Sequence, residues 1–195
     1  MGQRPLLATA EHVIRDYDGP LGITPFPHIR LYTANIVARH VDTDLALLEV
    51  ADYSPPRALQ LADDSEIVNN QLVTCFEYGT TRRLGKKTEL APATRIGNVT
   101  RSLRHLEVFG KAGDDCLELS FPALRGASGA PIISNMSGNL WGIVIVNYDY
   151  HLLPAPIESV LDEDNQIYEE IKFMLPQAIA VHVKHLRELL SRITE

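Results

Sequence analysis

The 195-residue sequence is poor in cysteine and in aromatic residues, and it has no long apolar run. It has two cysteines and 7% aromatic residues. No stretch approaches the run of about 18 apolar residues that a membrane-spanning helix needs, and the N-terminus lacks the apolar core of a secretory signal. A net charge of −7 gives no reason to expect nucleic acid or an anionic membrane surface as a partner. What is present, 45% hydrophobic and 22% charged residues, is ordinary for a globular protein with a sizeable core.

Dense turn signals separate short apolar runs, which predicts an all-β protein built from barrels. A linker is expected from Tyr53 to about Asn70. We therefore predict a first, partial barrel over residues 1–60 and a second barrel over residues 61–195. Strands are expected at 6–9, about 29–37 and 44–50 in the first barrel, and near 71–77, 89–99, 103–110, 115–120, 130–134, 140–147 and 177–183 in the second.

A serine lies in a glycine-flanked loop, Gly126-Ala127-Ser128-Gly129-Ala130-Pro131. A serine hydroxyl becomes a useful nucleophile when a base takes its proton and nearby donors stabilise the oxyanion that forms. The backbone N–H groups of Gly126 and Ser128 are candidate donors, because Gly126 has no side chain to restrict the turn. The loop alone fits a hairpin connection equally well.

Two upstream segments supply the other groups that such a serine needs. An apolar run over residues 6–10 leads into His12, and Asp44 stands at the start of the apolar run 45–50. A carboxylate that enters a buried strand needs a donor, and an imidazole N–H is a good one. Taken alone, His12 has the alternative interpretation of a structural histidine, and Asp44 that of an aspartate that caps a strand. Together with Ser128 they form a base, an orienting group and a nucleophile in the order His, Asp, Ser.

These segments resemble the trypsin/chymotrypsin-like serine peptidase family, in particular its HtrA-like branch. The resemblance is carried by Thr-Ala-Glu-His at 9–12, Asp-Leu-Ala-Leu-Leu at 44–48 and Gly-Ala-Ser-Gly-Ala-Pro at 126–131, and it extends over most of the chain. It implies two six-stranded antiparallel barrels with the active site between them, and a C-terminal helix. It further implies a serine endopeptidase that forms an acyl-enzyme on protein or peptide substrates, without a metal or other cofactor.

The resemblance also assigns a substrate pocket. Pro122 falls at the pocket floor, where an aspartate would select Arg or Lys, and Ala123 follows it. Val146 and Asn147 fall on the pocket wall. These neutral residues suggest a small or medium apolar side chain before the cut.

The chain departs from the family most clearly at its start, since eleven residues precede His12 where the family has two further strands. Either the chain begins downstream of the natural start, or another segment completes the first barrel, or that barrel is incomplete. A catalytically silent module that binds proteins or peptides is therefore the alternative function. A second alternative is an α/β-hydrolase with Ser128, Asp149 and His182, although its motif and the expected helix after the serine are imperfect.

Two further expectations concern an insertion and the cysteines. Residues 149–176 are acidic and predict helices inserted between the last two strands. Cys75 and Cys116 are expected to be free and buried, as in a reducing compartment. This predicts a cytoplasmic protein, unless an upstream signal is missing from the chain.

Overall fold

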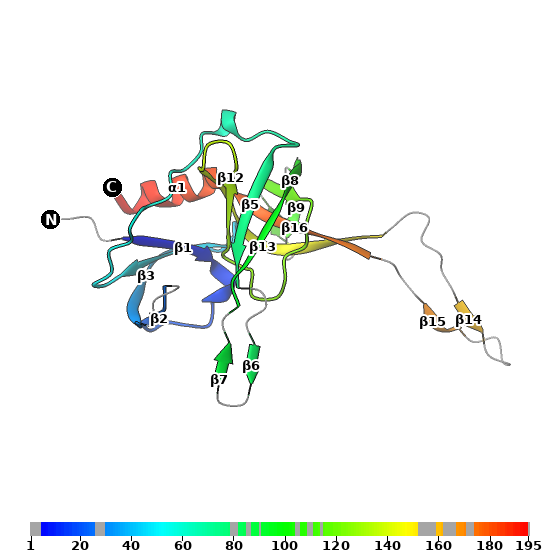
Figure 1. Ribbon diagram of the computed structural model, residues 1–195, viewed down its shortest axis with the longest axis horizontal. Coiled ribbons are helices and arrows are strands. Elements are labelled where there is room, and N and C mark those ends of the chain that lie inside the picture. Colours follow the sequence, from blue (N-terminus) through cyan, green and yellow to red (C-terminus); the bar gives the residue numbers. More distant parts are fainter. Residues whose placement is uncertain are drawn as a thin grey trace.

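Two antiparallel β units and a C-terminal helix make up the computed structural model of the chain (Figure 1). The structure describes residues 5–25, 30–78, 82–84, 87–89, 91–103, 106–108, 111–113, 115–151, 159–161, 167–170 and 174–194. No described helix has the length and apolar character that crossing a membrane would require. The prediction of an all-β, chymotrypsin-like fold with an incomplete first barrel and a C-terminal helix is confirmed.

The first unit is a curled, half-barrel sheet of four strands in the order β1-β4-β3-β2. A one-turn 3-10 helix, Glu11–Val13, follows β1 directly. The sequence analysis missed the short strand β2. The four strands are β1 (Leu6–Ala10), β2 (Leu21–Ile23), β3 (Tyr32–His40) and β4 (Leu45–Val50).

The second unit is a closed six-stranded barrel in the order β11-β16-β13-β12-β5-β8. A second 3-10 turn, Asp64–Glu66, lies in the segment that joins the two units, and helix α1 (Val183–Thr194) follows the last strand directly. The barrel strands are β5 (Leu72–Glu77), β8 (Ala93–Leu103), β11 (Cys116–Leu119), β12 (Pro131–Ser134), β13 (Leu140–His151) and β16 (Met174–His182).

Three two-stranded hairpins lie outside the barrel sheet in the described part of the chain, and two of them precede β11. One pairs β6 (Arg82–Leu84) with β7 (Lys87–Glu89), and the other pairs β9 (Leu106–Val108) with β10 (Lys111–Gly113). The strand predicted near 103–110 is thus a hairpin arm, because the barrel ladder of β8 ends at Leu103, opposite Cys116.

The prediction of helices in residues 149–176 is wrong for the described part of that stretch. Strands β13 and β16 continue their pairing as far as His151 and Met174. Beyond them, β14 (Ser159–Leu161) pairs with β15 (Ile167–Glu170) in a hairpin that Figure 1 shows well away from the barrel. Helix propensity is a weak preference, and the cross-strand pairing of Val160 with Glu169 and of Leu161 with Ile167 overrides it here.

Strand β4 is buried on both faces and lies between two apolar clusters. Leu45 and Leu47 belong to the large cluster, which also contains barrel residues and Leu186 and Leu189 of α1. Alternate residues of β4 face the smaller cluster of the half-barrel, namely Ala46, Leu48 and Val50. The two units therefore share one core, and β4 joins it to the half-barrel.

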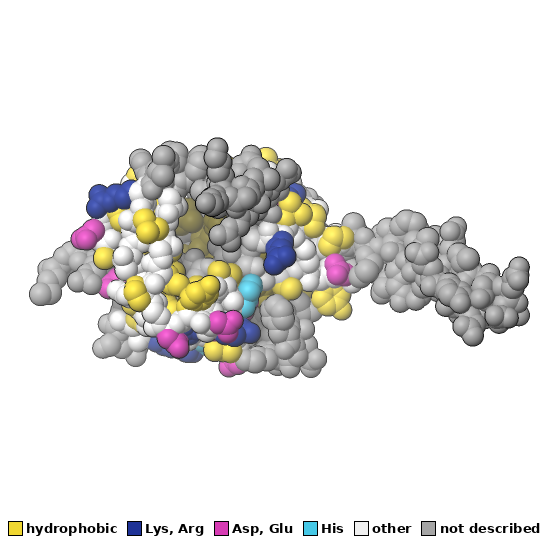
Figure 2. Space-filling view, turned by 90° about the horizontal axis from the view of Figure 1, so that it is seen from below, with side chains coloured by type: hydrophobic (Ala, Val, Ile, Leu, Met, Phe, Trp, Pro, Cys, Tyr) yellow, Lys and Arg dark blue, Asp and Glu magenta, His cyan; other side chains and the backbone are white. Residues whose placement is uncertain are grey.

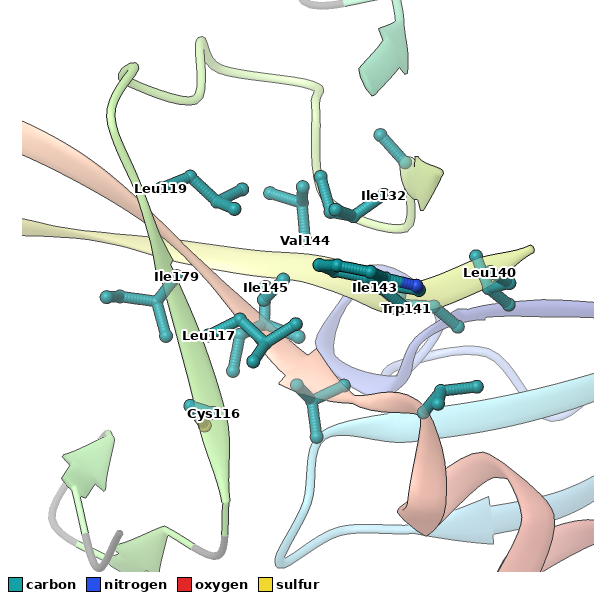
Figure 3. Packing of buried hydrophobic residues seen from close by; sticks show 14 of the residues in the cluster. Cys116, Leu117, Leu119, Ile132, Leu140, Trp141, Ile143, Val144, Ile145 and Ile179 are labelled. Carbon is teal, nitrogen blue, oxygen red and sulfur yellow. The ribbon is translucent and has the colours of Figure 1, made fainter. Parts of the chain in front are cut away.

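The large cluster fills the barrel, as Figure 3 shows for residues of β11, β12, β13 and β16. Trp141 is 1% exposed, and its indole N–H donates to Glu66 Oε1 at 3.1 Å. Glu66 also accepts from the side chains of Ser137 and Asn139, and these hydrogen bonds lower the pKa of its carboxyl. The connecting segment is thereby tied to the β12–β13 hairpin.

On the face of the molecule in Figure 2, exposed apolar side chains lie among charged side chains of both signs. The Lys and Arg side chains visible on the described part of this face form no continuous basic surface. This view agrees with the acidic net charge of the sequence.

We expect Gly142→Ala to destabilise the barrel by about 1–3 kcal/mol, the usual cost of overpacking. A Cβ at Gly142 would lie 2.7 Å from the carbonyl oxygen of Val181, in the paired strand β16, and 3.3 Å from the Ala180 side chain. Gly19→Ala is the matched control, because its added Cβ meets nothing within 4 Å. Urea unfolding of both variants measures the difference; equal stabilities would contradict the packing at Gly142.

Candidate active site

The loop that carries Ser128 is held by its own turns and by strand β13. Ala127 N–H donates to the Leu124 carbonyl and Ala130 N–H to the Ala127 carbonyl, both at 2.9 Å. Gly129 N–H donates to the Val144 carbonyl at 2.8 Å, which attaches the loop to β13. Gly126 and Gly129 have φ of 94° and 88°, a region in which a side chain is strained. The glycines on both sides of Ser128 are therefore required by the backbone of the loop.

The backbone amides of Gly126 and Ser128 differ from those of Ala127, Gly129 and Ala130 in their hydrogen bonding. Within the residues that the structure describes, these two N–H groups donate to no protein acceptor. The Ser128 hydroxyl lies 3.5 Å from the Ile145 carbonyl oxygen, which is too long for a strong hydrogen bond. The loop thus presents two amides and a hydroxyl that are available to a bound molecule.

His12 and Asp44, predicted as a pair, are in direct contact. Asp44 Oδ1 accepts the backbone N–H of His12 at 2.8 Å, and Asp44 Oδ2 lies 2.6 Å from His12 Nδ1. An ionised carboxylate can only accept, so in the tautomer that makes this contact a hydrogen bond to the carboxylate, Nδ1 is the donor. In that tautomer Nε2 is the ring nitrogen that is able to accept a proton.

Asp44 is held in an uncommon backbone conformation. Its φ is 54°, in the left-handed region, and it is 4% exposed. Its N–H donates to the Val41 carbonyl at 3.3 Å, and its carbonyl accepts the Glu11 N–H at 3.0 Å. The turn before β4 thus packs against the turn that carries His12, and residues held in this way often lie at functional sites.

The Ser128 loop also meets the strand that leads to His12. A Cβ added at Gly129 would lie 2.6 Å from Thr9 Oγ1 and 3.5 Å from the Ala10 nitrogen. The residue after Ser128 therefore packs directly on the end of β1, two residues before His12. The structure brings the three predicted segments to one place where the two β units meet.

The predicted pocket residues lie on two neighbouring segments. Pro122 and Ala123 are half-buried before the Ser128 loop, and Val146 and Asn147 are half-buried on β13. Asn147 uses its amide to bind the backbone of Ala123, accepting its N–H at 2.7 Å and donating to its carbonyl at 2.6 Å. The side chain predicted to line a pocket wall thus joins the two segments.

A buried acidic group next to His12 was missed by the sequence analysis. Glu11 is 2% exposed, and its carboxylate accepts from Arg15 Nε at 2.9 Å and lies 3.4 Å from Arg39 Nη1. Arg15 Nη2 lies 3.9 Å from Asp44 Oδ1, so the same arginine faces both carboxylates. The hydrogen bond and charge of Glu11 raise the pKa of Arg15. The four-residue spacing of Glu11 and Arg15 was a signal of their pairing, whereas nothing local indicated Arg39.

We expect Glu11→Gln to lower the free energy of unfolding by about 1–3 kcal/mol. The neutral amide keeps the volume but removes the charge that partners two guanidinium groups. Asp18→Asn is the control, since Asp18 is an exposed carboxyl. Urea unfolding at neutral pH tests this, and a Glu11→Gln variant as stable as the control would mean that the cluster adds nothing.

Cys75 and Cys116 are both buried, as predicted, and neither forms a disulfide bond within the described part of the chain. Burial raises the pKa of the Cys75 thiol to about 12, and the carboxylate of Glu77 adds to the shift. The thiol therefore stays protonated at neutral pH and is a poor nucleophile. Within the described part of the chain, no three His, Cys, Asp or Glu side chains are placed to hold a metal ion.

The α/β-hydrolase alternative is wrong, because the described sheets are antiparallel and Ser128 is followed by strand β12. His182, its candidate base, lies at the end of β16 and is 8% exposed. Its Nδ1 accepts the N–H of Lys184 at 3.1 Å and lies 4.0 Å from Asp64 Oδ1. Burial lowers the pKa of His182, with Lys184 and Arg187 in the same direction and Asp64 and Asp115 opposing them.

His182 should make the fold less stable in mild acid. Because its pKa in the folded state is lowered, the unfolded chain takes up the proton first, and stability falls as the pH drops below the ordinary value of about 6.5. Urea unfolding of wild type and His182→Gln at pH 7.5 and 5.5 measures this. The free energy of unfolding of the wild type minus that of the variant should be smaller at pH 5.5 than at pH 7.5. The same difference at both pH values would contradict a lowered pKa of His182 in the folded state.

Two joined antiparallel β units, one carrying the serine loop and the other the histidine–aspartate pair, define the chymotrypsin-like class of proteins. The chain belongs to the trypsin-like peptidase domain family, which matches residues 1–143. This membership supports a peptidase, that is, a hydrolase that acts on peptides or proteins. No curated protein matched the sequence.

Solved structures share the fold at low sequence identity. A serine-to-alanine variant of the HtrA-type protease AlgW with a tripeptide has a TM-score of 0.67 and 17% identity, covering 100% of this chain and 54% of that one. The MamO protease domain from Magnetospirillum magneticum has a TM-score of 0.63 and 17% identity, and the match covers 96% of this chain and 84% of the MamO chain. An inactive serine-to-alanine mutant of Rv3671c from M. tuberculosis has a TM-score of 0.62 and 15% identity, and the match covers 98% of this chain and 78% of the Rv3671c chain. The chain spans about half the length of the AlgW structure.

Proposed function

We propose that the chain is a serine endopeptidase that cleaves peptide bonds through an acyl-enzyme on Ser128. The observation that carries this proposal is the 2.6 Å contact of His12 Nδ1 with Asp44 Oδ2, beside a serine loop that packs on the end of β1. A carboxylate that binds Nδ1 leaves Nε2 as the base, which is the role that a serine nucleophile requires.

In the first step Ser128 Oγ bonds to the substrate carbonyl carbon while its proton passes to His12 Nε2. The amides of Gly126 and Ser128 donate to the oxyanion, and their lack of an acceptor among the described residues supports this role. His12 then gives the proton to the leaving amine as the C–N bond breaks. A water molecule releases the acyl group by the same steps, and Asp44 holds the imidazole throughout.

Protein or peptide segments are the proposed substrates, and no step requires a metal or another cofactor. The AlgW structures contain bound peptides, a tripeptide and a decapeptide, which supports peptide binding by this fold. A silent binding module is the competing function, and it differs in one property: its serine would not be activated.

Labelling with a fluorophosphonate, which reacts with activated serines, tests the proposal. The wild-type chain should be labelled, and Ser128→Ala should not. His12→Ala and Asp44→Asn should label about 10³–10⁴-fold more slowly, because each removes the base or its correct tautomer. Ser102→Ala, at an exposed serine of β8, should label like the wild type.

Circular dichroism of each variant shows that the fold is kept. A folded wild-type chain without labelling would overturn the peptidase proposal in favour of the binding module. Labelling that survives Ser128→Ala would assign the nucleophile to another residue.

A further inference from the structure

Strand β3 contains one residue more than the stretch of β4 with which it pairs. The register shifts between Ile36 and Ala38, so Val37 has no partner of its own in β4. An extra residue of this kind turns the side chains that follow it to the other face of the sheet. Arg39, two residues beyond Val37, therefore lies opposite Ala46 and shares its face, on which the smaller apolar cluster packs.

The Arg39 side chain reaches the turn that carries His12. Its Nη1 donates to Glu11 Oε1 at 3.4 Å and to the Arg15 carbonyl at 3.1 Å, and its Nη2 donates to the Tyr17 carbonyl. The Arg39 side chain is 25% exposed and the Glu11 side chain 2%, so water screens this pair less than a surface pair. One guanidinium group thus holds the residue before His12 through its carboxylate and two residues after His12 through their backbone.

The β3–β4 hairpin holds the same turn at a second place. Its connecting turn ends at Asp44, whose carboxylate accepts the His12 N–H and contacts His12 Nδ1. The Asp44 carbonyl also accepts the Glu11 N–H at 3.0 Å. Arg39 and Asp44 are five positions apart in one hairpin. Any rotation of the His12 turn about its contacts with Asp44 would therefore break the hydrogen bonds of Arg39.

We propose that Arg39 is a positioning residue of the peptidase, which fixes the His12 turn and so the place of the imidazole relative to Ser128. The proposal rests on the proposed function of Ser128. Without the guanidinium group, Asp44 would still bind His12, but the residues that follow His12 would lose their side-chain link to β3. Reacting groups must lie about 3–3.5 Å apart, and a misplacement of about 1 Å costs up to about 10²-fold in rate.

Fluorophosphonate labelling of Arg39→Lys and Arg39→Gln measures this role. Lysine keeps the charge, but its single ammonium group lacks the planar fork that spans three acceptors. Both variants should be labelled at least about tenfold more slowly than the wild type, because the imidazole is no longer held in place.

Arg101→Gln is the matched control. Arg101 also binds a buried carboxylate, since its Nε donates to Glu118 Oε1 at 2.8 Å and Glu118 is 2% exposed. This pair lies on β8 and β11, neither of which pairs with β12 or β13, the strands next to the Ser128 loop. Arg101→Gln should therefore be labelled at the wild-type rate.

The Nδ1 proton of His12 gives a second readout, which does not depend on Ser128. A proton that an imidazole shares with a carboxylate has a far-downfield NMR signal, and the loss of this signal in His12→Gln assigns it. The signal should be present in the wild type and in Arg101→Gln. It should be weakened or absent in folded Arg39→Gln, because a less firmly held ring exchanges this proton with water more quickly.

The outcomes separate the two proposals. If the wild type is labelled and both Arg39 variants are labelled at its rate, the positioning role is overturned and the peptidase stands. Equally slow labelling of Arg101→Gln, or an Nδ1 signal in the Arg39 variants that matches the wild type, also overturns it. If the folded wild type is not labelled, the proposed function fails and the positioning role with it. Arg39→Lys supplies both readouts if Arg39→Gln does not fold.

Discussion

A buried carboxylate at the start of a doubly buried strand is the constraint on which the rest of the site depends. Asp44 stands directly before β4, whose alternate residues enter the two apolar clusters, so its carboxylate has little access to water. A charge in such a position must be satisfied by donors from the protein. His12 supplies two, its backbone N–H and Nδ1, and its own position therefore follows from the burial of Asp44.

Apolar packing sets the distance between the two halves of the site. The large cluster contains Ala10 from β1 and Leu45 and Leu47 from β4, together with barrel residues and the buried face of α1. Because close-packed interiors resist displacement, the histidine–aspartate pair is held at a fixed place relative to β13. The Ser128 loop is bonded to that strand and lies against β1 through Gly129, so the shared core carries both sides of the site.

Polar side chains around the site hold backbone segments in place. The Glu11 carboxylate accepts hydrogen bonds from Arg15 and Arg39. Arg39 also donates to the backbone carbonyl groups of Arg15 and Tyr17, which follow the His12 turn. Asn147 performs a similar task for Ala123 on the barrel side. Contacts within the protein therefore fix the segments around the candidate site, and the proposed function would require such fixed positions for its reacting groups.

Much of the fold and the local chemistry could be predicted from the sequence. The turn-rich pattern and the apolar runs indicated β units and a terminal helix. The glycines around Ser128 indicated a tight loop. These features could be predicted because they depend on residues that are neighbours in the chain. The patterns around His12 and Asp44 were informative for the same reason, since His12 lies in the turn directly after β1 and Asp44 directly before β4. The pairing of His12 with Asp44 needed the additional argument that a buried carboxylate must find a donor.

The sequence by itself determined the residue types of the site and the class of fold, and the tertiary structure decided which distant groups meet. Strands replaced the expected helices in the described part of 149–176, because β13 continues its pairing with the distant strand β16 as far as His151 and Met174, and tertiary contacts override a weak helix propensity. Arg39 reaches Glu11 across 28 positions and Asn147 reaches Ala123 across 24. No local pattern encodes such contacts, because they depend on strand register and on how two β units pack around a common core.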